Sequence, residues 1–192
     1  MVTHFRNDDV SMNTDFFKLD EIYNSIHDVF PDAEIWSCVT IFARSNTKGT
    51  IYPQVPFKSK PFDYFLEVDR VLDKYKPPSF VKIVSHGLWH LNHADISDDL
   101  QEASIVTSCN ILDTTIFVPP FNYWNKTTED ICRKHDIELI KTYDREVDPS
   151  DFIWRSIEHN EFNPAHNKWY FHSWAWDRNS LMKKLTSQAR NK

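Results

Sequence analysis

The predicted fold depends most on residues 80–90, Phe-Val-Lys-Ile-Val-Ser-His-Gly-Leu-Trp-His, because this stretch joins a strand to a pair of histidines. Its β-branched residues predict a strand at 80–84, and polar residues follow where that strand ends. The same pattern occurs at three other places: 3–6 leads into Asn7-Asp8-Asp9, 115–118 into Pro119-Pro120-Phe121-Asn122, and 168–171 into His172. Loops after the strands of a parallel α/β sheet gather on one face. If the strands are parallel, we expect these four clusters to converge.

Helical and extended segments alternate along the chain, which predicts an α/β protein with mostly parallel strands and outer helices. Apolar spacing predicts helices at 16–30, 62–75, 98–112, 128–135 and 179–189, and two further strands at 35–42 and 137–141. The polar loop at 44–60 is long enough to be a lid, and 144–167 is the least regular stretch. We find no internal repeat or linker, so we expect a single domain over residues 1–192.

Composition excludes several classes of function. The chain has two glycines, Gly49 and Gly87, far too few and too distant for a phosphate-binding loop. Its net charge of -6 and short basic clusters argue against a nucleic-acid partner. Cys38, Cys109 and Cys132 form no CxxC pair and are predicted to be free thiols in a reducing compartment. No apolar run approaches the ~20 residues that span a bilayer, and no signal peptide is apparent, so we expect a cytoplasmic protein without a membrane partner.

The residues best suited to bind a metal are His86 and His90. Imidazoles four residues apart lie one turn apart on a helix and can share a cation, with His93 as a substitute or a supporting group. A carboxylate from the Asp8-Asp9 pair is the expected third ligand, because adjacent anions repel each other unless a cation is near. The second carboxylate would then be free to act as a base. Alternatively, the histidine spacing is a coincidence among nine histidines, and the aspartates start a turn or cap a helix.

Four motifs follow one another along the chain: Asn7-Asp8-Asp9, His86-x-x-x-His90, Val118-Pro119-Pro120-Phe121 and Phe171-His172. In this order they resemble the motifs of the polysaccharide deacetylase family, also called the NodB-homology or carbohydrate esterase 4 type. The likeness covers most of the chain, from Thr3 to Asp177. It is greatest to the divergent, cytoplasmic-type branch of sugar and O-antigen de-N-acetylases. The resemblance implies a distorted (β/α) barrel that holds one divalent metal, usually zinc.

The resemblance also implies a role for each motif. It assigns the metal ligands to Asp9, His86 and His90, the base to Asp8, the oxyanion donor to the backbone N–H of Phe121, and the general acid to His172. General chemistry agrees with these roles. A dication polarises the amide and lowers the pKa of bound water toward ~7. A carboxylate takes the proton of that water as it attacks, and a histidine protonates the leaving amine.

The chain departs from the family pattern at three places, the first being Val10, which stands where the family usually has a glycine after the aspartate pair. Val118 stands where the family usually has an arginine that pairs with the base, so that pairing is lost or comes from Arg6 or Arg155, which the sequence does not separate. The fourth family motif, an aspartate with a tryptophan, is matched only by Asp151 with Trp154. These departures bear on the predicted activity and substrate more than on the predicted fold.

Residues around two of the motifs are candidates for substrate contacts. If residues 171–177 are extended, Trp174 and Trp176 point to the same side as His172 and could hold the acetyl methyl group or stack on a sugar ring. The loop after strand 115–118 could line the groove with Pro120, Asn122, Tyr123 and Trp124. The alternatives are core packing for the tryptophans and a solvated surface for the loop.

Three functions follow from this reading. The first is a metal-dependent hydrolase that removes an N-acetyl group from a carbohydrate substrate, with one divalent metal, Zn²⁺ first, as cofactor. The second is a catalytically impaired protein of the same fold that binds metal and carbohydrate. The third is a hydrolase of small amides or O-acetyl esters on the same scaffold. Metal analysis combined with an acetate-release assay would separate them, whereas the sequence predicts neither the sugar nor the oligomeric state.

Overall fold

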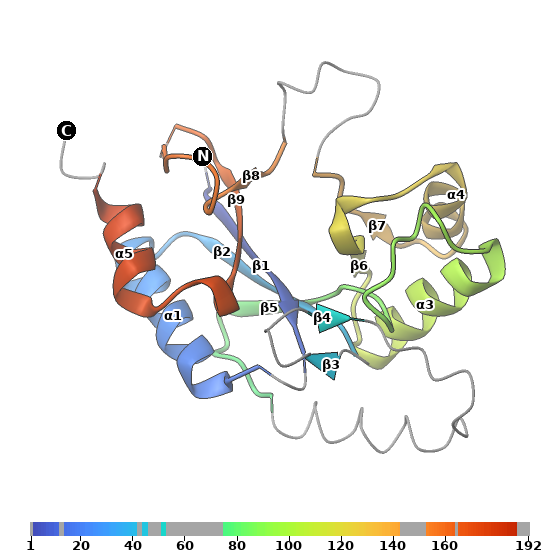
Figure 1. Cartoon of the computed structure of the whole chain (residues 1–192), viewed down its shortest axis with the longest axis horizontal. Coiled ribbons are helices and arrows are strands. Elements are labelled where there is room, and N and C mark those ends of the chain that lie inside the picture. Colours follow the sequence, from blue (N-terminus) through green and yellow to red (C-terminus); the bar gives the residue numbers. More distant parts are fainter. Residues whose placement is uncertain are drawn as a thin grey trace.

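The chain folds around a seven-stranded sheet with the strand order β7-β6-β5-β2-β1-β9-β8 (Figure 1). The computed structural model describes residues 2–11, 14–41, 44–45, 51–52, 75–142, 153–163 and 165–187. The strands of this sheet are β1 (His4–Val10), β2 (Glu34–Val39), β5 (Val81–Ser85), β6 (Ile116–Phe117), β7 (Glu138–Leu139), β8 (Arg155–Ser156) and β9 (Lys168–His172). All neighbouring strands are parallel, and the sheet curls into part of a barrel. The predicted α/β class and distorted barrel are confirmed.

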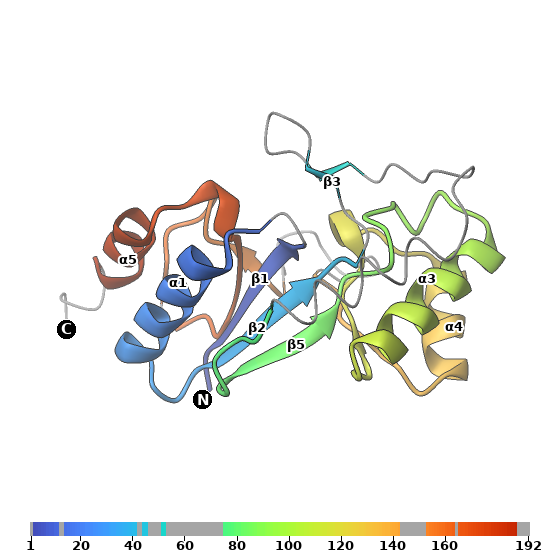
Figure 2. The same ribbon diagram turned by 90° about the horizontal axis from the view of Figure 1, so that it is seen from below.

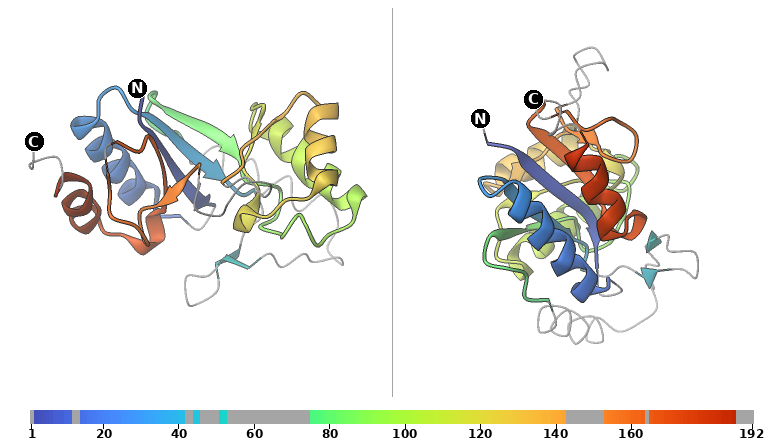
Figure 3. Two further views of the ribbon diagram at one scale, coloured as in Figure 1. Left: turned by 90° about the horizontal axis from the view of Figure 1, so that it is seen from above. Right: turned by 90° about the vertical axis from the view of Figure 1, so that its left-hand side faces the viewer.

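The helices cover the sheet in two pairs (Figures 2 and 3). Helix α1 (Phe16–Val29) and helix α5 (Arg178–Thr186) lie side by side against the β1 part of the sheet. Helix α3 (Asp98–Ile111) and helix α4 (Lys126–Lys134) pack together beside the β5–β7 part. Side-chain caps start three of these helices, because free N–H groups of a first turn need acceptors. The caps are Asp15 for α1, Asn125 for α4 and Asp177 for α5.

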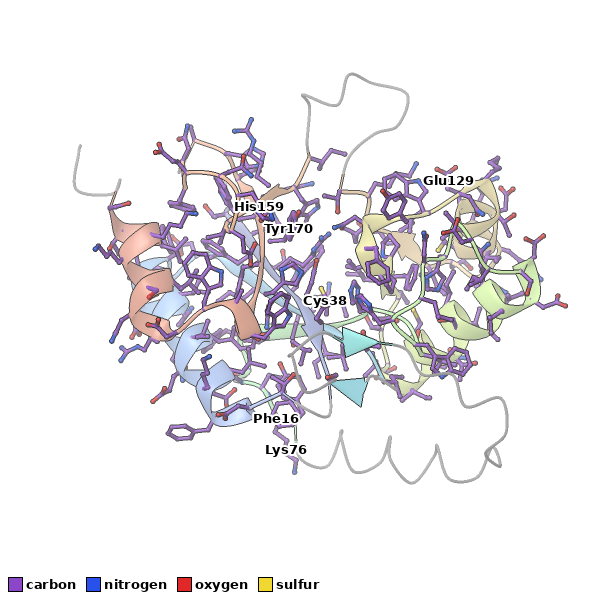
Figure 4. The ribbon with its side chains drawn as sticks, in the orientation of Figure 1. Phe16, Cys38, Lys76, Glu129, His159 and Tyr170 are labelled. Atoms are coloured by element: carbon purple, nitrogen blue, oxygen red, sulfur yellow. The ribbon has the colours of Figure 1, made fainter. Side chains whose placement is uncertain are left out.

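Strand β1 lies between β2 and β9, and its side chains alternate between the two faces of the sheet, as the two-residue period of a strand requires. Phe5 faces α1 and α5 and belongs to the main apolar core. Arg6 and Asp8 face the opposite side, beside a second apolar cluster. That cluster contains Trp36, Cys38, Val84, Ile116, Val118, Ile140 and Trp154, with Tyr170 packed against it. Figure 4 shows Cys38 and Tyr170 among the side chains gathered over the centre of the sheet.

The register of the sheet aligns the predicted polar clusters. Asp8 of β1 lies opposite His172 of β9, and Val39 of β2 lies opposite Ser85 of β5, directly before His86. Ser85 in turn lies opposite Phe117, close to the prolines that follow β6. Because these strands run in the same direction, the ends of β1, β5, β6 and β9 meet at one edge of the sheet. The four clusters therefore do converge.

Several elements differ from their predicted bounds. The prediction that the first strand ends before Asn7 is wrong, because β1 stays paired with β2 and β9 and runs on to Val10. Strand β8 lies inside the stretch 144–167 that was predicted to be irregular. Two short strands, β3 (Arg44–Ser45) and β4 (Ile51–Tyr52), pair within the predicted loop 44–60. The rest of that loop, residues 144–152 and the predicted helix 62–75 up to residue 74 lie outside the described residues.

All three cysteines are buried and unpaired, as predicted. Burial raises the pKa of Cys38 well above its usual value, that of Cys109 to about 11 and that of Cys132 to about 12. Thiols with such pKa values are poor nucleophiles and metal ligands at neutral pH. In the described part of the chain, no helix has the length and apolar character needed to cross a bilayer.

Candidate metal centre

A pocket of about 190 Å³ opens where the strand ends meet. Its lining comes from four segments that are far apart in the sequence but adjacent in the sheet. The lining residues are Asp8, Asp9, His86, His90, Phe121, Asn122, His172 and Trp174. All of them belong to the four predicted clusters or to the segment that follows His172.

Three side chains in this pocket could hold a metal ion. Asp9 Oδ1 lies 2.8 Å from His90 Nε2 and 3.3 Å from His86 Nε2, and the three possible ligand atoms lie within 4.8 Å of one another. Ligand atoms around a tetrahedral zinc ion lie about 3.3 Å apart, because the bonds are about 2.0–2.2 Å long. The spacing and the mixed carboxylate–imidazole donor set therefore fit a divalent metal such as zinc. Three protein ligands leave a position free for water or substrate, as catalytic sites require.

The protonation of the site also suits a metal. Burial raises the pKa of Asp9, but the hydrogen bonds and charges of His86 and His90 lower it further, so that the pKa lies well below its usual value. Asp9 is therefore anionic, as a ligand must be. His86 Nδ1 lies 2.8 Å from the carbonyl oxygen of Val118 and donates to it, so Nε2 is the ring nitrogen that faces the pocket.

A backbone irregularity places both neighbouring aspartates at the pocket. Consecutive residues of a regular strand point to opposite faces, so Asp8 and Asp9 would separate. The register between β1 and β2 shifts between Asn7 and Val10, and Asp9 has φ 65°. This local bulge turns Asp9 toward the histidines while Asp8 stays in register with β9. Backbone strain of this kind is typical of functional sites.

The histidines lie on a loop, and the expectation of one helical turn between them is wrong. The loop brings the two ring centroids within 5.3 Å through a tight bend at Gly87, which has φ 89°. A Cβ at Gly87 would lie 3.0 Å from the backbone oxygen of Trp89. A glycine is needed here because both the dihedral angle and the close approach exclude other residues.

His93 lies under this loop and outside the group of candidate ligands. It is fully buried, with Nδ1 beside the Leu91 carbonyl and Nε2 beside the Ser104 hydroxyl. Burial lowers its pKa to about 4, so the ring is neutral and braces the loop. The alternative that His93 replaces one of the ligands is not supported by this placement.

Of the two arginines considered as partners of the base, Arg6 contacts Asp8. Its Nη2 donates to Asp8 Oδ2 at 2.8 Å, and both side chains are buried. Arg155 is exposed on β8, and the ion pair of Asp8 is made by Arg6. Asp8 Oδ1 has no hydrogen-bond partner in the described part of the chain and remains available to accept a proton.

The sequence did not identify Glu158, which holds His172. Glu158 Oε1 accepts from the His172 backbone N–H at 2.7 Å and lies 3.3 Å from His172 Nδ1. Burial raises the pKa of Glu158, but His172 and Ser156 lower it further, to about 2. Trp154, one of the two residues matched to the fourth family motif, lies over Arg6 with its ring centroid 4.9 Å from Cζ. The other, Asp151, lies outside the described residues.

The turn after β6 forms part of the pocket wall. Residues 120–122 form a 3-10 turn, Pro120–Asn122, in which both Phe121 and Asn122 have positive φ, 58° and 56°. The N–H groups of Asn122 and Tyr123 bond to Pro119 and Pro120 within the turn, and the Phe121 N–H is not used in these two bonds. The ring of Phe121 lies 4.3 Å from that of His90.

Only part of the predicted substrate surface borders the pocket. Residues Ser173–Ala175 form a 3-10 turn, so the expectation of an extended segment is wrong. Trp174 is 57% exposed beside the pocket, whereas Trp176 packs against the main core and donates to Glu158. Of the loop residues, Asn122 lines the pocket, but Pro120 and Trp124 are buried outside its lining.

Solved structures with the same fold belong to carbohydrate esterase family 4. A pseudoenzyme of that family from Bacillus anthracis has a TM-score of 0.54 and 12% identity, over 98% of this chain and 61% of its own. A family 4 carbohydrate esterase from Streptomyces lividans, solved with acetate, has a TM-score of 0.53 and 7% identity, over 99% and 88%. A peptidoglycan deacetylase from Bacillus subtilis has a TM-score of 0.53 and 13% identity, over 97% and 84%.

These comparisons show the fold of the chain and nothing finer. The chain spans about three fifths of the length of the Bacillus anthracis pseudoenzyme, since 61% of that protein is covered. No protein-family model matches the sequence, and no curated protein is similar enough to be counted as a relative. The predicted O-antigen branch of the family stays a prediction.

Proposed function

We propose that the protein is a metal-dependent hydrolase of the polysaccharide deacetylase type that removes N-acetyl groups from a carbohydrate. The observation that carries this proposal is the pocket itself. Asp9, His86 and His90 are spaced for a metal, and Asp8 and His172 face each other across β1 and β9 beside them. A metal site with one flanking base and one flanking acid suits the hydrolysis of an amide.

The metal would be held by Asp9, His86 and His90, and Zn²⁺ fits this donor set best. When bound, such an ion polarises the acetyl carbonyl and lowers the pKa of water. The protein residues supply the remaining functions. The backbone carbonyl of Val118 fixes the tautomer of His86, and the bulge at Asp9 fixes the carboxylate that joins the two histidines.

Asp8 acts as the general base in this proposal. Its Oδ2 is held by Arg6, whereas Oδ1 is buried without a hydrogen-bond partner in the described part of the chain. The free oxygen can accept the proton of a water that attacks the acetyl carbonyl. The negative charge that develops on the carbonyl oxygen needs a donor, and the Phe121 N–H at the pocket wall supplies one.

His172 acts as the general acid. Glu158 fixes the ring through Nδ1, so that Nε2 points toward the pocket, where it lies 3.8 Å from Asp9 Oδ2. Burial lowers the pKa of His172, but Glu158, Asp9 and Asp8 together raise it to about 9. A protonated ring at neutral pH can give its proton to the leaving amine. A bound dication would lower this pKa from that value.

Glu158→Gln should move the alkaline limb of the activity profile to lower pH. The acid is active only while His172 is protonated, so turnover falls as the pH rises through the pKa of His172. Glutamine keeps the shape of Glu158 but removes its charge, which lowers that pKa. Turnover measured between neutral and alkaline pH checks this, with the exposed Glu161→Gln as the matched control. An alkaline limb at the same pH in Glu158→Gln and wild type would contradict the pairing.

Trp174 is the best candidate for a contact with a sugar ring. Its indole is largely exposed beside the pocket, and its Nε1 lies 3.4 Å from Asp9 Oδ2. Aromatic faces pack well against the apolar face of a pyranose, and Phe121 exposes a second ring across the pocket. This pair of exposed rings favours a carbohydrate over a small free amide.

Trp174→Ala should raise KM for an oligosaccharide about fivefold and change kcat little, because a stacking contact contributes about 1 kcal/mol to binding. Phe17→Ala is the matched control, since Phe17 is also exposed but does not line the pocket. Steady-state kinetics with an N-acetylglucosamine oligomer measure both values. Equal KM values for Trp174→Ala and wild type would remove Trp174 from the substrate site.

Acetate release tests the proposed function. The protein is stripped with a chelator, reloaded with Zn²⁺ and incubated with N-acetylglucosamine oligomers, O-acetylated sugars and small acetylated amides. We expect acetate from the N-acetylated oligomers only, and only after reloading. Release from O-acetyl esters or small amides alone would favour another hydrolase on this scaffold. Binding of zinc and sugar without acetate from any substrate would favour a catalytically impaired carbohydrate-binding protein.

A further inference from the structure

Arg6 occupies a buried position that its packing does not require. Its guanidinium lies between the rings of Trp154 and Tyr170, with Cζ 4.9 Å and 5.0 Å from their centroids, and the residue is fully buried. In the part of the chain that the structure describes, Nε and Nη1 have no hydrogen-bond partner. A long apolar side chain would fill the same space without the cost of burying a charge. The charge therefore points to another role.

Within the described residues, one nitrogen makes all the hydrogen bonds of this guanidinium. Nη2 donates to Asp8 Oδ2 at 2.8 Å, to Asn122 Oδ1 at 2.8 Å and to Thr142 Oγ1 at 3.2 Å. Asn122 and Thr142 also bond to each other. The three acceptors belong to the end of β1, the turn after β6 and the segment after β7. Arg6 thus joins three separate strand ends at one point.

The turn after β6 needs such a restraint. Phe121 and Asn122 both have positive φ, a backbone conformation that is strained for residues other than glycine. Asn122 Oδ1 receives hydrogen bonds from Arg6 and Thr142, which hold the second of these two residues. The Phe121 N–H belongs to the peptide group between Pro120 and Phe121, inside the same turn. Hydrogen bonds that hold the Asn122 side chain therefore restrain the turn that carries this donor.

We propose that Arg6 is a positioning residue that sets the base and the oxyanion donor together, by holding the Asp8 carboxylate and the Asn122 side chain with the same nitrogen. This inference rests on the proposed function for the roles of Asp8 and Phe121. It goes beyond a charge that only tunes the base, because removing Arg6 releases two parts of the site at once. Its consequence is that the Arg6 and Asn122 contributions to turnover are coupled.

The kinetic test is a double-mutant cycle with Arg6→Met and Asn122→Ala. Arg6→Met should lower kcat about 10²–10³-fold, comparable to loss of an oxyanion donor, with KM changed less than about threefold. The double variant should be no slower than Arg6→Met alone within about threefold, because both changes remove the same restraint. Multiplicative losses in the double variant would overturn the proposal. Arg155→Met, an exposed arginine on β8, is the matched control and should behave as wild type.

A structural readout tests Arg6 independently of turnover. In ¹H–¹⁵N spectra of zinc-loaded protein, the amide signals of Phe121 and Asn122 should shift or broaden in Arg6→Met but not in Arg155→Met. Zinc affinity should stay within about threefold of wild type, because Arg6 contacts none of the three candidate ligands. Unchanged Phe121 and Asn122 signals would overturn the positioning role. If the wild type releases no acetate, the proposed function fails while these spectra still decide the role of Arg6.

A second route covers the case in which Arg6→Met does not fold. Arg6→Lys keeps a cation between the two rings but cannot reach Asp8 and Asn122 as the planar guanidinium does. It should therefore show the same direction of change in kcat and in the Phe121 and Asn122 signals. Wild-type kcat and spectra in a folded Arg6→Lys would show that a charge alone is sufficient, and would overturn the proposal.

Discussion

Replacing Asp9 by asparagine should abolish tight metal binding. The Asp9 carboxylate is the anion between two buried imidazoles, and asparagine offers only a neutral oxygen in its place. Loss of an outer partner of a ligand already lowers metal affinity by about 10–100-fold, so loss of the ligand charge should lower zinc affinity more than about 100-fold. Acetate release should then fall to background. Titration with zinc against a competing chelator measures the affinity.

The neighbouring carboxylate provides the control for Asp9→Asn. Asp8→Asn makes the same chemical change one residue earlier, at a side chain bonded to Arg6 instead of the histidines. It should bind one zinc ion with an affinity close to that of wild type. Full zinc stoichiometry at wild-type affinity in Asp9→Asn would show that Asp9 is not a ligand.

Asp8→Asn should lower turnover about 10²–10⁴-fold while metal is retained, because a positioned general base contributes that factor. Asparagine has nearly the same shape, and its side-chain oxygen can still accept from Arg6 Nη2. It cannot take a proton from water at neutral pH. KM should change little, since the pocket walls remain in place.

The measurement for Asp8→Asn is single-turnover acetate release with protein in excess over substrate. This separates the chemical step from product release. Glu158→Gln is a useful comparison, because it should change the pH dependence more than the maximal rate. If Asp8→Asn turned over at more than about a tenth of the wild-type rate, another group would have to be the base.

The sequence was sufficient to predict the convergence of the site. Polar residues after each of four predicted strands indicated one edge of a parallel sheet, and the structure places Asp9, His86 and His172 at that edge. This inference succeeds because the direction of a parallel sheet is a global property that needs no knowledge of side-chain angles. The helix predicted at 16–30 also agrees closely with α1, Phe16–Val29, because its apolar residues recur with the helical period.

Local backbone geometry could not be predicted in the same way. The loop of His86 and His90 looks like a helical turn by spacing alone, but the bend at Gly87 depends on packing against Ser104 and Trp89. The bulge at Asp9 depends on pairing with β2, which is distant in the sequence. Such features follow from tertiary contacts that no local pattern encodes.

The sequence also did not show which residues hold Asp8 and His172 in place. The sequence did not separate Arg6 from Arg155, because the first strand was predicted to end at Arg6. Since β1 runs on to Val10, the two-residue period of the strand puts Arg6 and Asp8 on the same face. Glu158 follows a strand of two residues, too short for a periodic signal. Its charge next to another turn resembles any surface glutamate, so only its burial against His172 identifies it.

The most direct test of the central claim is diffraction from zinc-loaded crystals at the zinc absorption edge. We predict one anomalous peak within bonding distance of Asp9 Oδ1, His86 Nε2 and His90 Nε2, with Asp8 unbonded beside it. A peak held by other residues, or the absence of a peak at these three atoms in a zinc-saturated crystal, would contradict the account.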